Sequence, residues 1–176
     1  MPTELQDDVN SQNVKQLIEM PNGQLWIGTV KGIYQMSLAA LKKFVISDWS
    51  APLSSTIDSQ ENIWSLRFFD DDSIYVGTER GLFKTDMSAS PLLFMFEPQQ
   101  NIEDISDKSV KSIATDKNGN VWIGTQFNGA MFWSPKSTSF TSISNSINTK
   151  PENRLSHNNV LSLYQEDKNT LWIGTT

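Results

Sequence analysis

The chain has 176 residues, of which 38% are hydrophobic and 10% aromatic, so it holds enough apolar material for one ordinary folded domain. Its 14 Lys and Arg residues against 20 Asp and Glu residues give a net charge of −6, and the basic residues are scattered. That pattern excludes nucleic acid as a partner, because phosphate binding needs a clustered cationic surface.

Cysteine is absent, which excludes disulfides, Cys-ligated zinc and thiol catalysis. No segment approaches the ~20 apolar residues of a membrane-spanning helix, and the opening MPTELQDDVN lacks the basic and apolar regions of a signal peptide. We therefore expect no membrane contact by this segment, and a targeting signal, if the protein is exported, outside it.

Four groups of short strands are predicted along the chain, each rich in β-branched and aromatic residues and bounded by Gly, Asn, Pro or Ser. The first group, about 14–46, reads VKQLIEM, QLWIGTV, GIYQMSL and KKFVIS, and the second, about 63–96, reads IWSLRFF, SIYVGT, GLFKTD and LLFMF. The third, about 110–143, reads VKSIATD, NVWIGT, GAMFWS and SFTSIS, whereas the fourth, about 160–176, supplies only VLSLYQE and LWIGTT. Short links within each group predict antiparallel hairpins, and hence four-stranded meanders.

The four groups are copies of one unit with a period of about 48 residues. In each copy a mid-strand glycine follows a β-branched residue that lies 14 positions upstream. These pairs are Val14 and Gly28, Ile63 and Gly77, Val110 and Gly124, and Val160 and Gly174. A glycine weakens a strand interior and indicates that something bulky comes close, for which we expect a tryptophan of the neighbouring unit.

The second strand of each unit is apolar on successive positions, as in Leu25, Trp26 and Ile27, and a strand of this kind is covered on both faces. Sheets of about 40 to 50 residues stacked face to face are typical of a β-propeller. The predicted fold is therefore all-β: residues 1–176 form a partial β-propeller of about three and a half four-stranded antiparallel blades. Inter-blade packing is the role expected of the aromatic residues at the repeat position, which are Trp26, Tyr75, Trp122 and Trp172.

The shared pattern V-x-x-[IL]-x-x-D-x-x-G-x-[LV]-W-I-G-T-x-x-G-[LI] resembles the two-component regulator propeller repeat. Its clearest instance runs from Val110 to Thr125, and residues 154–175 resemble it nearly as well. The copy around Tyr75 departs most, although it keeps Gly77 and Thr78. Because the family's propellers usually carry about seven blades, the resemblance implies that this chain is a fragment of a longer propeller, cut within its fourth blade.

Proteins with this repeat are extracytoplasmic sensor regions of bacterial membrane regulators, above all hybrid histidine kinases and in some lineages diguanylate cyclases. The resemblance thus implies a ligand-sensing, non-catalytic segment in the periplasmic or extracytoplasmic part of an inner-membrane protein. Two alternatives stay open. One is a propeller enzyme of the polysaccharide lyase or hydrolase type, and the other is an interaction scaffold, in which a homodimer of two half-propellers completes one ring.

A ligand site is expected on the face that gathers the long connections between blades, near the central axis, because loops on a rigid scaffold vary without disturbing its packing. Its ligand is an unknown small molecule, with carbohydrate as one candidate class. Rings and planar polar groups suit such ligands, and the candidate residues of this face are Trp49, Arg80, Phe127, Arg154, His157 and Asn158.

No cofactor or metal site is expected. His157 is the only histidine, so a multi-histidine metal site is excluded, and a solvated loop residue is favoured over a catalytic one. Asp70, Asp71 and Asp72 are consecutive and lack the alternating spacing of a calcium loop, which favours a solvated hairpin turn. The stretch TDKNGNVW, at 115–122, is similar to the Asp-box of sialidase-type propellers, but its Asp-to-Gly spacing is one residue too long.

Overall fold

The computed structural model describes residues 13–30, 32–37, 62–69, 73–86, 105, 108–134, 140–167 and 169–176. Within these residues the regular elements are β-strands, apart from one short 3₁₀ helix, η2 (Pro151–Asn153). The strands are β1 (Val14–Glu19), β2 (Gln24–Thr29), β3 (Gly32–Ser37), β4 (Ile63–Phe68), β5 (Ser73–Thr78), β6 (Gly81–Asp86), β7 (Val110–Thr115), β8 (Val121–Thr125), β9 (Ala130–Trp133), β10 (Phe140–Ile143), β11 (Val160–Gln165) and β12 (Leu171–Thr175).

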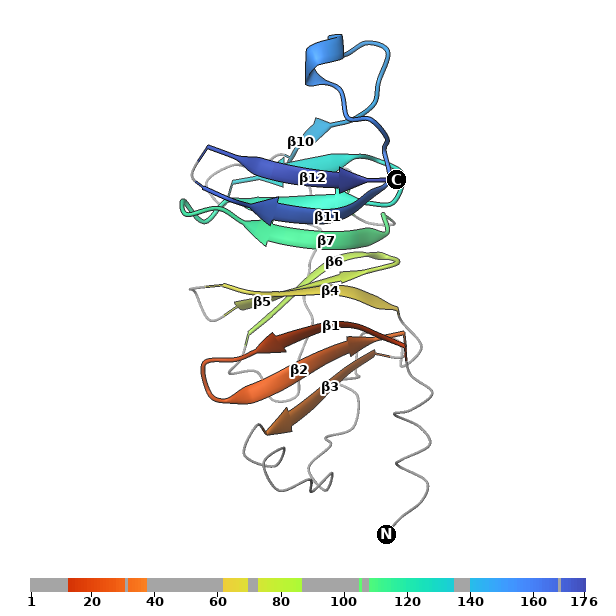
Figure 1. Ribbon diagram of the computed structural model, residues 1–176. Helices are drawn as coiled ribbons and strands as arrows, with labels where there is room; N and C mark the ends of the chain where they lie inside the picture. Colours follow the sequence, from red (N-terminus) through yellow and green to blue (C-terminus); the bar gives the residue numbers. More distant parts are fainter. Residues whose placement is uncertain are drawn as a thin grey trace.

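The strands form four antiparallel sheets, which follow one another in chain order in Figure 1. Their strand orders are β1-β2-β3, β4-β5-β6, β10-β9-β8-β7 and β11-β12. The third sheet has the four strands of the predicted meander. The expected fourth strands of the first two units, at 42–47 and 92–96, lie outside the described residues. The predicted all-β partial propeller is confirmed by this arrangement.

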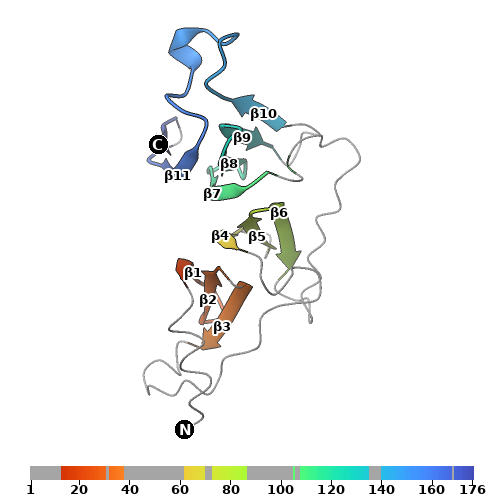
Figure 2. The same cartoon turned by 90° about the vertical axis from the view of Figure 1, so that its right-hand side faces the viewer.

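The first strand of each sheet lies at a common inner edge. Strand β1 contacts β4, β4 contacts β7, and β7 contacts β11, and Figure 2 shows these four strands along the same side of the stack. Polar side chains also link them: the Gln16 amide of β1 pairs with the backbone N–H and C=O of Leu66 in β4, at 2.9 and 3.0 Å. Since the innermost strands of a propeller surround its axis, residues of these strands that point away from the sheets face the central channel.

Apolar side chains fill the space between successive sheets. In the first gap, Trp26 packs with Ile63 and Leu66 of the next sheet, and in the second gap Tyr75 packs with Val110 and Ile113. The residue that follows the aromatic residue in the strand faces the opposite way. Val76, which follows Tyr75, lies in the first gap, and Ile123, which follows Trp122, lies in the second. Aromatic and aliphatic residues of the second strand therefore fill the two neighbouring gaps, as the apolar run predicts.

The repeat glycine marks the closest approach between sheets, but the expected tryptophan neighbour is wrong. A Cβ built on Gly28 would lie 2.9 Å from Ile63 Cγ2, and one built on Gly77 would lie 2.7 Å from Val110 Cγ1. At Gly124 the nearest atom of the next sheet is Val160 Cγ1, at 2.6 Å. At Gly77 and Gly124 the Oγ of a serine in the same sheet, Ser65 or Ser112, lies closer still. The space is thus needed both by this serine and by the β-branched residue that opens the next unit, because the first strand, and not the second, is the closest part of the neighbouring sheet.

The threonine that ends the second strand holds the following loop. The Thr125 hydroxyl donates to the Gly129 carbonyl at 2.8 Å and accepts the Asn128 N–H at 2.9 Å. Thr78 does the same for the shorter loop before β6, accepting the Arg80 N–H at 3.0 Å. Both threonine side chains are fully buried, and their hydrogen bonds to the loop explain why the repeat ends in threonine.

The tight turns between the first and second strands are structural. Gly23 and Gly119 adopt φ angles of 78° and 76°, as their place in a tight turn predicts. Asp116 Oδ1 accepts the backbone N–H groups of Asn118 and Asn120, each at 2.9 Å. The aspartate of the repeat therefore stabilises a turn.

The two ends of the stack carry apolar side chains that no described sheet covers. On β1, Val14 is 48% and Leu17 54% exposed, whereas their counterparts Ile63 and Leu66 are fully buried. On β12, Trp172 is 60% exposed, although its counterpart Trp26 is 2% exposed. The packing role expected of Trp172 is thus not filled within the described residues, because the gap that it faces has no second sheet there.

The contact between Gly124 and Val160 can be measured by a double-mutant cycle. We expect Gly124→Ala to lower the free energy of unfolding by about 1 to 3 kcal/mol through overpacking. All four proteins carry Ser112→Ala, because the Ser112 Oγ lies closer to the added Cβ than Val160 does. With Val160→Ala, which removes the remaining clashing methyl groups, the same substitution should cost at least about 1 kcal/mol less. Chemical denaturation gives the four free energies, and additive effects would contradict the contact.

Two tryptophans of the repeat provide a second test. Trp26→Ala should destabilise the chain by about 3 to 5 kcal/mol, because it removes a buried aromatic side chain. Trp172→Ala should change the free energy of unfolding by about 0.5 kcal/mol or less, since the ring is largely exposed. Equal losses in thermal or denaturant unfolding would contradict the assignment of Trp26 to the core and of Trp172 to an open face.

Candidate functional site

Each inner strand contains a β-bulge at the same place. The antiparallel register shifts between Val14 and Gln16 in β1, and likewise at the start of β4, β7 and β11. A bulge leaves one residue out of the ladder and redirects its side chain. The residues at this position are Lys15, Trp64, Lys111 and Leu161.

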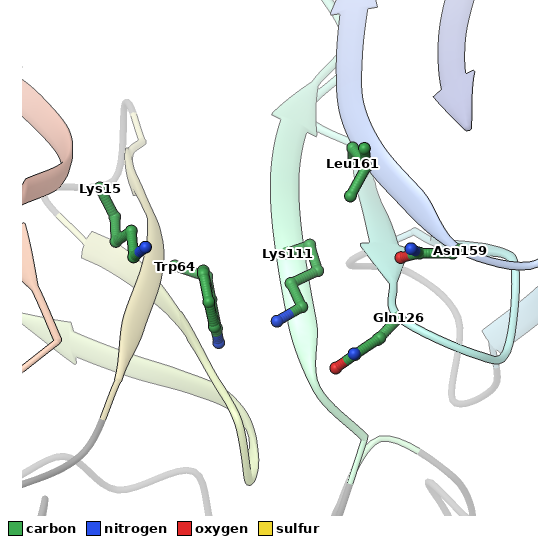
Figure 3. Close-up of a pocket in the computed structure, with 6 residues that line it drawn as sticks. All are labelled: Lys15, Trp64, Lys111, Gln126, Asn159 and Leu161. Atoms are coloured by element: carbon green, nitrogen blue, oxygen red, sulfur yellow. The ribbon is translucent and has the colours of Figure 1, made fainter. Parts of the chain in front are cut away.

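All four bulge residues line one cavity of about 360 Å³ at the inner edge of the sheets. Two amide side chains complete the lining, Gln126 from the loop after β8 and Asn159 from the residue before β11. Figure 3 shows these six side chains, which come from all four sheets. The regular bulge thus creates a cavity in a packing repeat, because it places a non-repeated residue of each unit around one space.

Two lysines flank an aromatic ring in this cavity. The Lys111 ammonium nitrogen lies 3.2 Å and the Lys15 nitrogen 4.6 Å from the centre of the Trp64 ring. In Figure 3 the ring stands between the two lysines. Such cation–π contacts attract the ammonium groups to the ring faces, but they supply no negative charge. Within the described part of the chain, no carboxylate forms a salt bridge with either lysine.

Two buried polar atoms of the lining are without a hydrogen-bond partner in the described part of the chain. They are the indole nitrogen Nε1 of Trp64, which can only donate, and the side-chain oxygen Oδ1 of Asn159, which can only accept. A buried polar atom without a partner is costly. Neighbouring atoms cover both of these atoms, so a ligand gains a hydrogen bond there when it displaces that cover.

The electrostatics of the cavity act on Lys111. Burial holds the pKa of its ammonium below the usual range, and the Lys15 charge lowers this pKa further, whereas the Glu79 carboxylate acts in the opposite direction. An anion in the cavity would oppose both lowering effects. The arrangement therefore favours a negatively charged ligand group close to Lys111.

Five of the six residues expected to bind a ligand are described, and none of these five lines the cavity. Trp49 lies outside the described residues, whereas Arg80 is exposed and Phe127 is 70% exposed at the loop after β8. Phe127 and Asn158 are the direct neighbours of the lining residues Gln126 and Asn159. The cavity lies where the inner strands begin, at the ends joined by the long connections, so the expected region and the observed cavity adjoin.

Three of those candidates hold the connection between β10 and β11. Arg154 donates from Nε to the Thr149 carbonyl at 2.5 Å and from Nη2 to the Ile147 carbonyl at 2.7 Å. Asn158 Oδ1 accepts the Asn145 N–H at 2.6 Å. His157 Nδ1 accepts the Asn159 N–H at 3.0 Å, so this ring helps to position a lining residue. The hydrogen bonds observed for these three side chains hold the connection between β10 and β11 in place.

The cavity was missed because a β-bulge leaves no mark in the hydrophobic pattern. One signal was available: the position directly after the β-branched residue carries Lys, Trp, Lys and Leu in the four copies. The side chain at this position varies in size and charge, whereas the residue before it is β-branched in all four copies. Variation inside a strand of a repeat, and not only in its loops, would have indicated the site.

The part of the chain with described coordinates offers no cluster of three or more His, Asp or Glu residues that could hold a metal ion. In the same residues no helix is long and apolar enough to cross a membrane.

Residues 104–127 and 154–176 match the family model described as two component regulator propeller. The chain is similar to the extracellular domain of the putative one component system BT4673 from B. thetaiotaomicron, with 21% identity, a TM-score of 0.71, and coverage of 93% of this chain and 20% of that chain. The extracellular domain of the putative hybrid two component system BT3049 of the same organism has 20% identity, a TM-score of 0.69 and the same coverage.

A catalytically inactive virginiamycin B lyase from Staphylococcus aureus is similar at 11% identity, with a TM-score of 0.58 and coverage of 92% of this chain and 48% of that chain. Comparison with curated protein sequences gives no match. The chain spans about a fifth of the length of the two extracellular domains. At these identities the similar structures establish the propeller fold alone.

The charges around Lys111 can be tested by titration. We expect its ammonium to titrate below the ordinary lysine value of 10.5. Lys15→Met removes a repulsive charge and should raise the pKa of Lys111, whereas Glu79→Gln removes an attractive charge and should lower it. Lysine-detected NMR with Lys111→Arg as the assignment control gives the three values. A Lys111 pKa that is indifferent to both substitutions would contradict the arrangement.

Proposed function

We propose that this chain, which carries two component regulator propeller repeats, is a non-catalytic, ligand-sensing segment of a bacterial membrane signalling protein. The observation that carries the proposal is the match of two successive units, residues 104–127 and 154–176, to the two component regulator propeller model. Similar extracellular domains from putative one component and hybrid two component systems support it. A histidine kinase or diguanylate cyclase is the output module that fits such a segment.

The site chemistry favours sensing over catalysis. A hydrolase or lyase needs groups in named roles: a nucleophile or base, and a partner that orients it. The cavity is lined by two lysines, two amides, a tryptophan and a leucine. A lysine can accept a proton, but this lining offers it no carboxylate or imidazole as the partner that orients it. Reversible binding is the activity that this set of side chains supports.

An extracytoplasmic position follows from this proposal, because a sensor of external ligands lies outside the inner membrane. The chain has no cysteine, so a single cysteine introduced at Phe127, which is 70% exposed, gives one labelling site within it. We expect a maleimide that does not cross the inner membrane to label Phe127→Cys in intact cells that express the whole protein.

The matched control is Val121→Cys, at a fully buried position, which should react only after denaturation. The parent protein without either substitution measures labelling outside this segment. Labelling of Phe127→Cys only after the cells are lysed would contradict the extracytoplasmic position and, with it, the sensor function.

A further inference from the structure

We propose that the cavity between the inner strands binds a small organic carboxylate that also carries hydroxyl groups. This inference rests on the proposed sensor function and gives the ligand chemistry of its site. It follows from three properties of the lining: its charge, its two unpartnered polar atoms and its size.

Charge selects an anion. The protein as a whole carries a net charge of −6, yet the cavity gathers the ammonium groups of Lys15 and Lys111, whose contacts there are with the Trp64 ring. The Lys15 charge repels the partly buried Lys111 ammonium, the Glu79 carboxylate offsets part of this effect, and a bound anion would offset more of it. A carboxylate beside Lys111 would form a charge-assisted hydrogen bond, which is stronger than one between neutral groups.

The unpartnered atoms select more than a bare anion. Trp64 Nε1 needs an acceptor, which a carboxylate or a hydroxyl oxygen supplies, but Asn159 Oδ1 needs a donor. A carboxylate alone has no donor, and a neutral polyol has no charge for the lysines. One molecule meets both needs when it carries a carboxylate and at least one hydroxyl group.

The lining also limits how the ligand lies. Lysines cover both faces of the Trp64 ring (Figure 3), so the ring is not free to stack on a ligand. The volume of about 360 Å³ is at the lower end of the ~300 to 1,000 Å³ typical of small-molecule sites. The occupant is therefore a compact molecule, with Leu161 available to contact its carbon chain.

Three six-carbon probes separate these requirements by calorimetric titration of the purified protein. Gluconate carries both a carboxylate and hydroxyl groups, sorbitol has the hydroxyl groups without the charge, and hexanoate has the charge without the hydroxyl groups. We expect gluconate to bind, and to bind at least about tenfold more tightly than either of the others, because each of them leaves part of the lining unsatisfied.

Variants of the lining connect binding to this cavity. Lys111→Met should weaken gluconate binding at least about tenfold through loss of a charge-assisted hydrogen bond. Trp64→Phe keeps an aromatic ring for the lysines but removes the N–H, and should weaken binding by about two- to tenfold. The control is Lys117→Met, an equal change of charge at an exposed turn on the far end of β7, which should leave the affinity unchanged.

The outcome is decisive in either direction. Equal binding of gluconate and sorbitol, no binding of gluconate, or equal losses in Lys111→Met and Lys117→Met would each overturn the inference. Circular dichroism of each variant ensures that a loss is not caused by unfolding. None of these results bears on the labelling of Phe127→Cys, so the ligand class can fail while the proposed sensor segment stands.

Discussion

The fold depends on one contact, the insertion of a β-branched side chain against the glycine of the preceding sheet. Ile63 packs on Gly28, Val110 on Gly77 and Val160 on Gly124, in each case closer than a Cβ on the glycine would allow. Because this contact joins the first strand of one unit to the second strand of the unit before it, it sets both the spacing and the register of the sheets. The aromatic and aliphatic residues beside the glycine then fill the remaining space of the two neighbouring gaps.

The same contact leaves one position of the inner strand free. The bulge that follows Ile63 or Val110 takes the next residue out of the ladder, so that residue is not needed for strand pairing. Trp64 and Lys111 occupy this position in two neighbouring sheets, and the Lys111 ammonium group contacts the Trp64 ring. A scaffold built from nearly identical units thereby gains a cavity lined by unlike residues, which is what the proposed recognition of an asymmetric ligand requires.

The fold was largely predictable from the sequence, because period, turn residues and strand patterns all point to the same structure. The strands of the third unit and their antiparallel pairing agree with the sequence prediction. The partner of the repeat glycine was not predictable in this way, since a strand pattern says which faces are covered but not by which strand. The cavity was not predicted for a related reason: Lys15 and Lys111 read as ordinary exposed strand residues until the bulge turns them toward one space. The loop residues Arg154 and Asn158 suggested binding by their type, but their side chains hold the loop itself.

The central claim is that repeated residues build the scaffold and that the bulge residues between them bind the ligand. A crystal structure of the protein with gluconate tests this claim most directly. The account predicts ligand density in the cavity, with the carboxylate beside Lys111 and a hydroxyl group within hydrogen-bond distance of Asn159 Oδ1. Gluconate bound instead at the exposed loops around Phe127 or His157, with the bulge residues making no contact to it, would contradict the account.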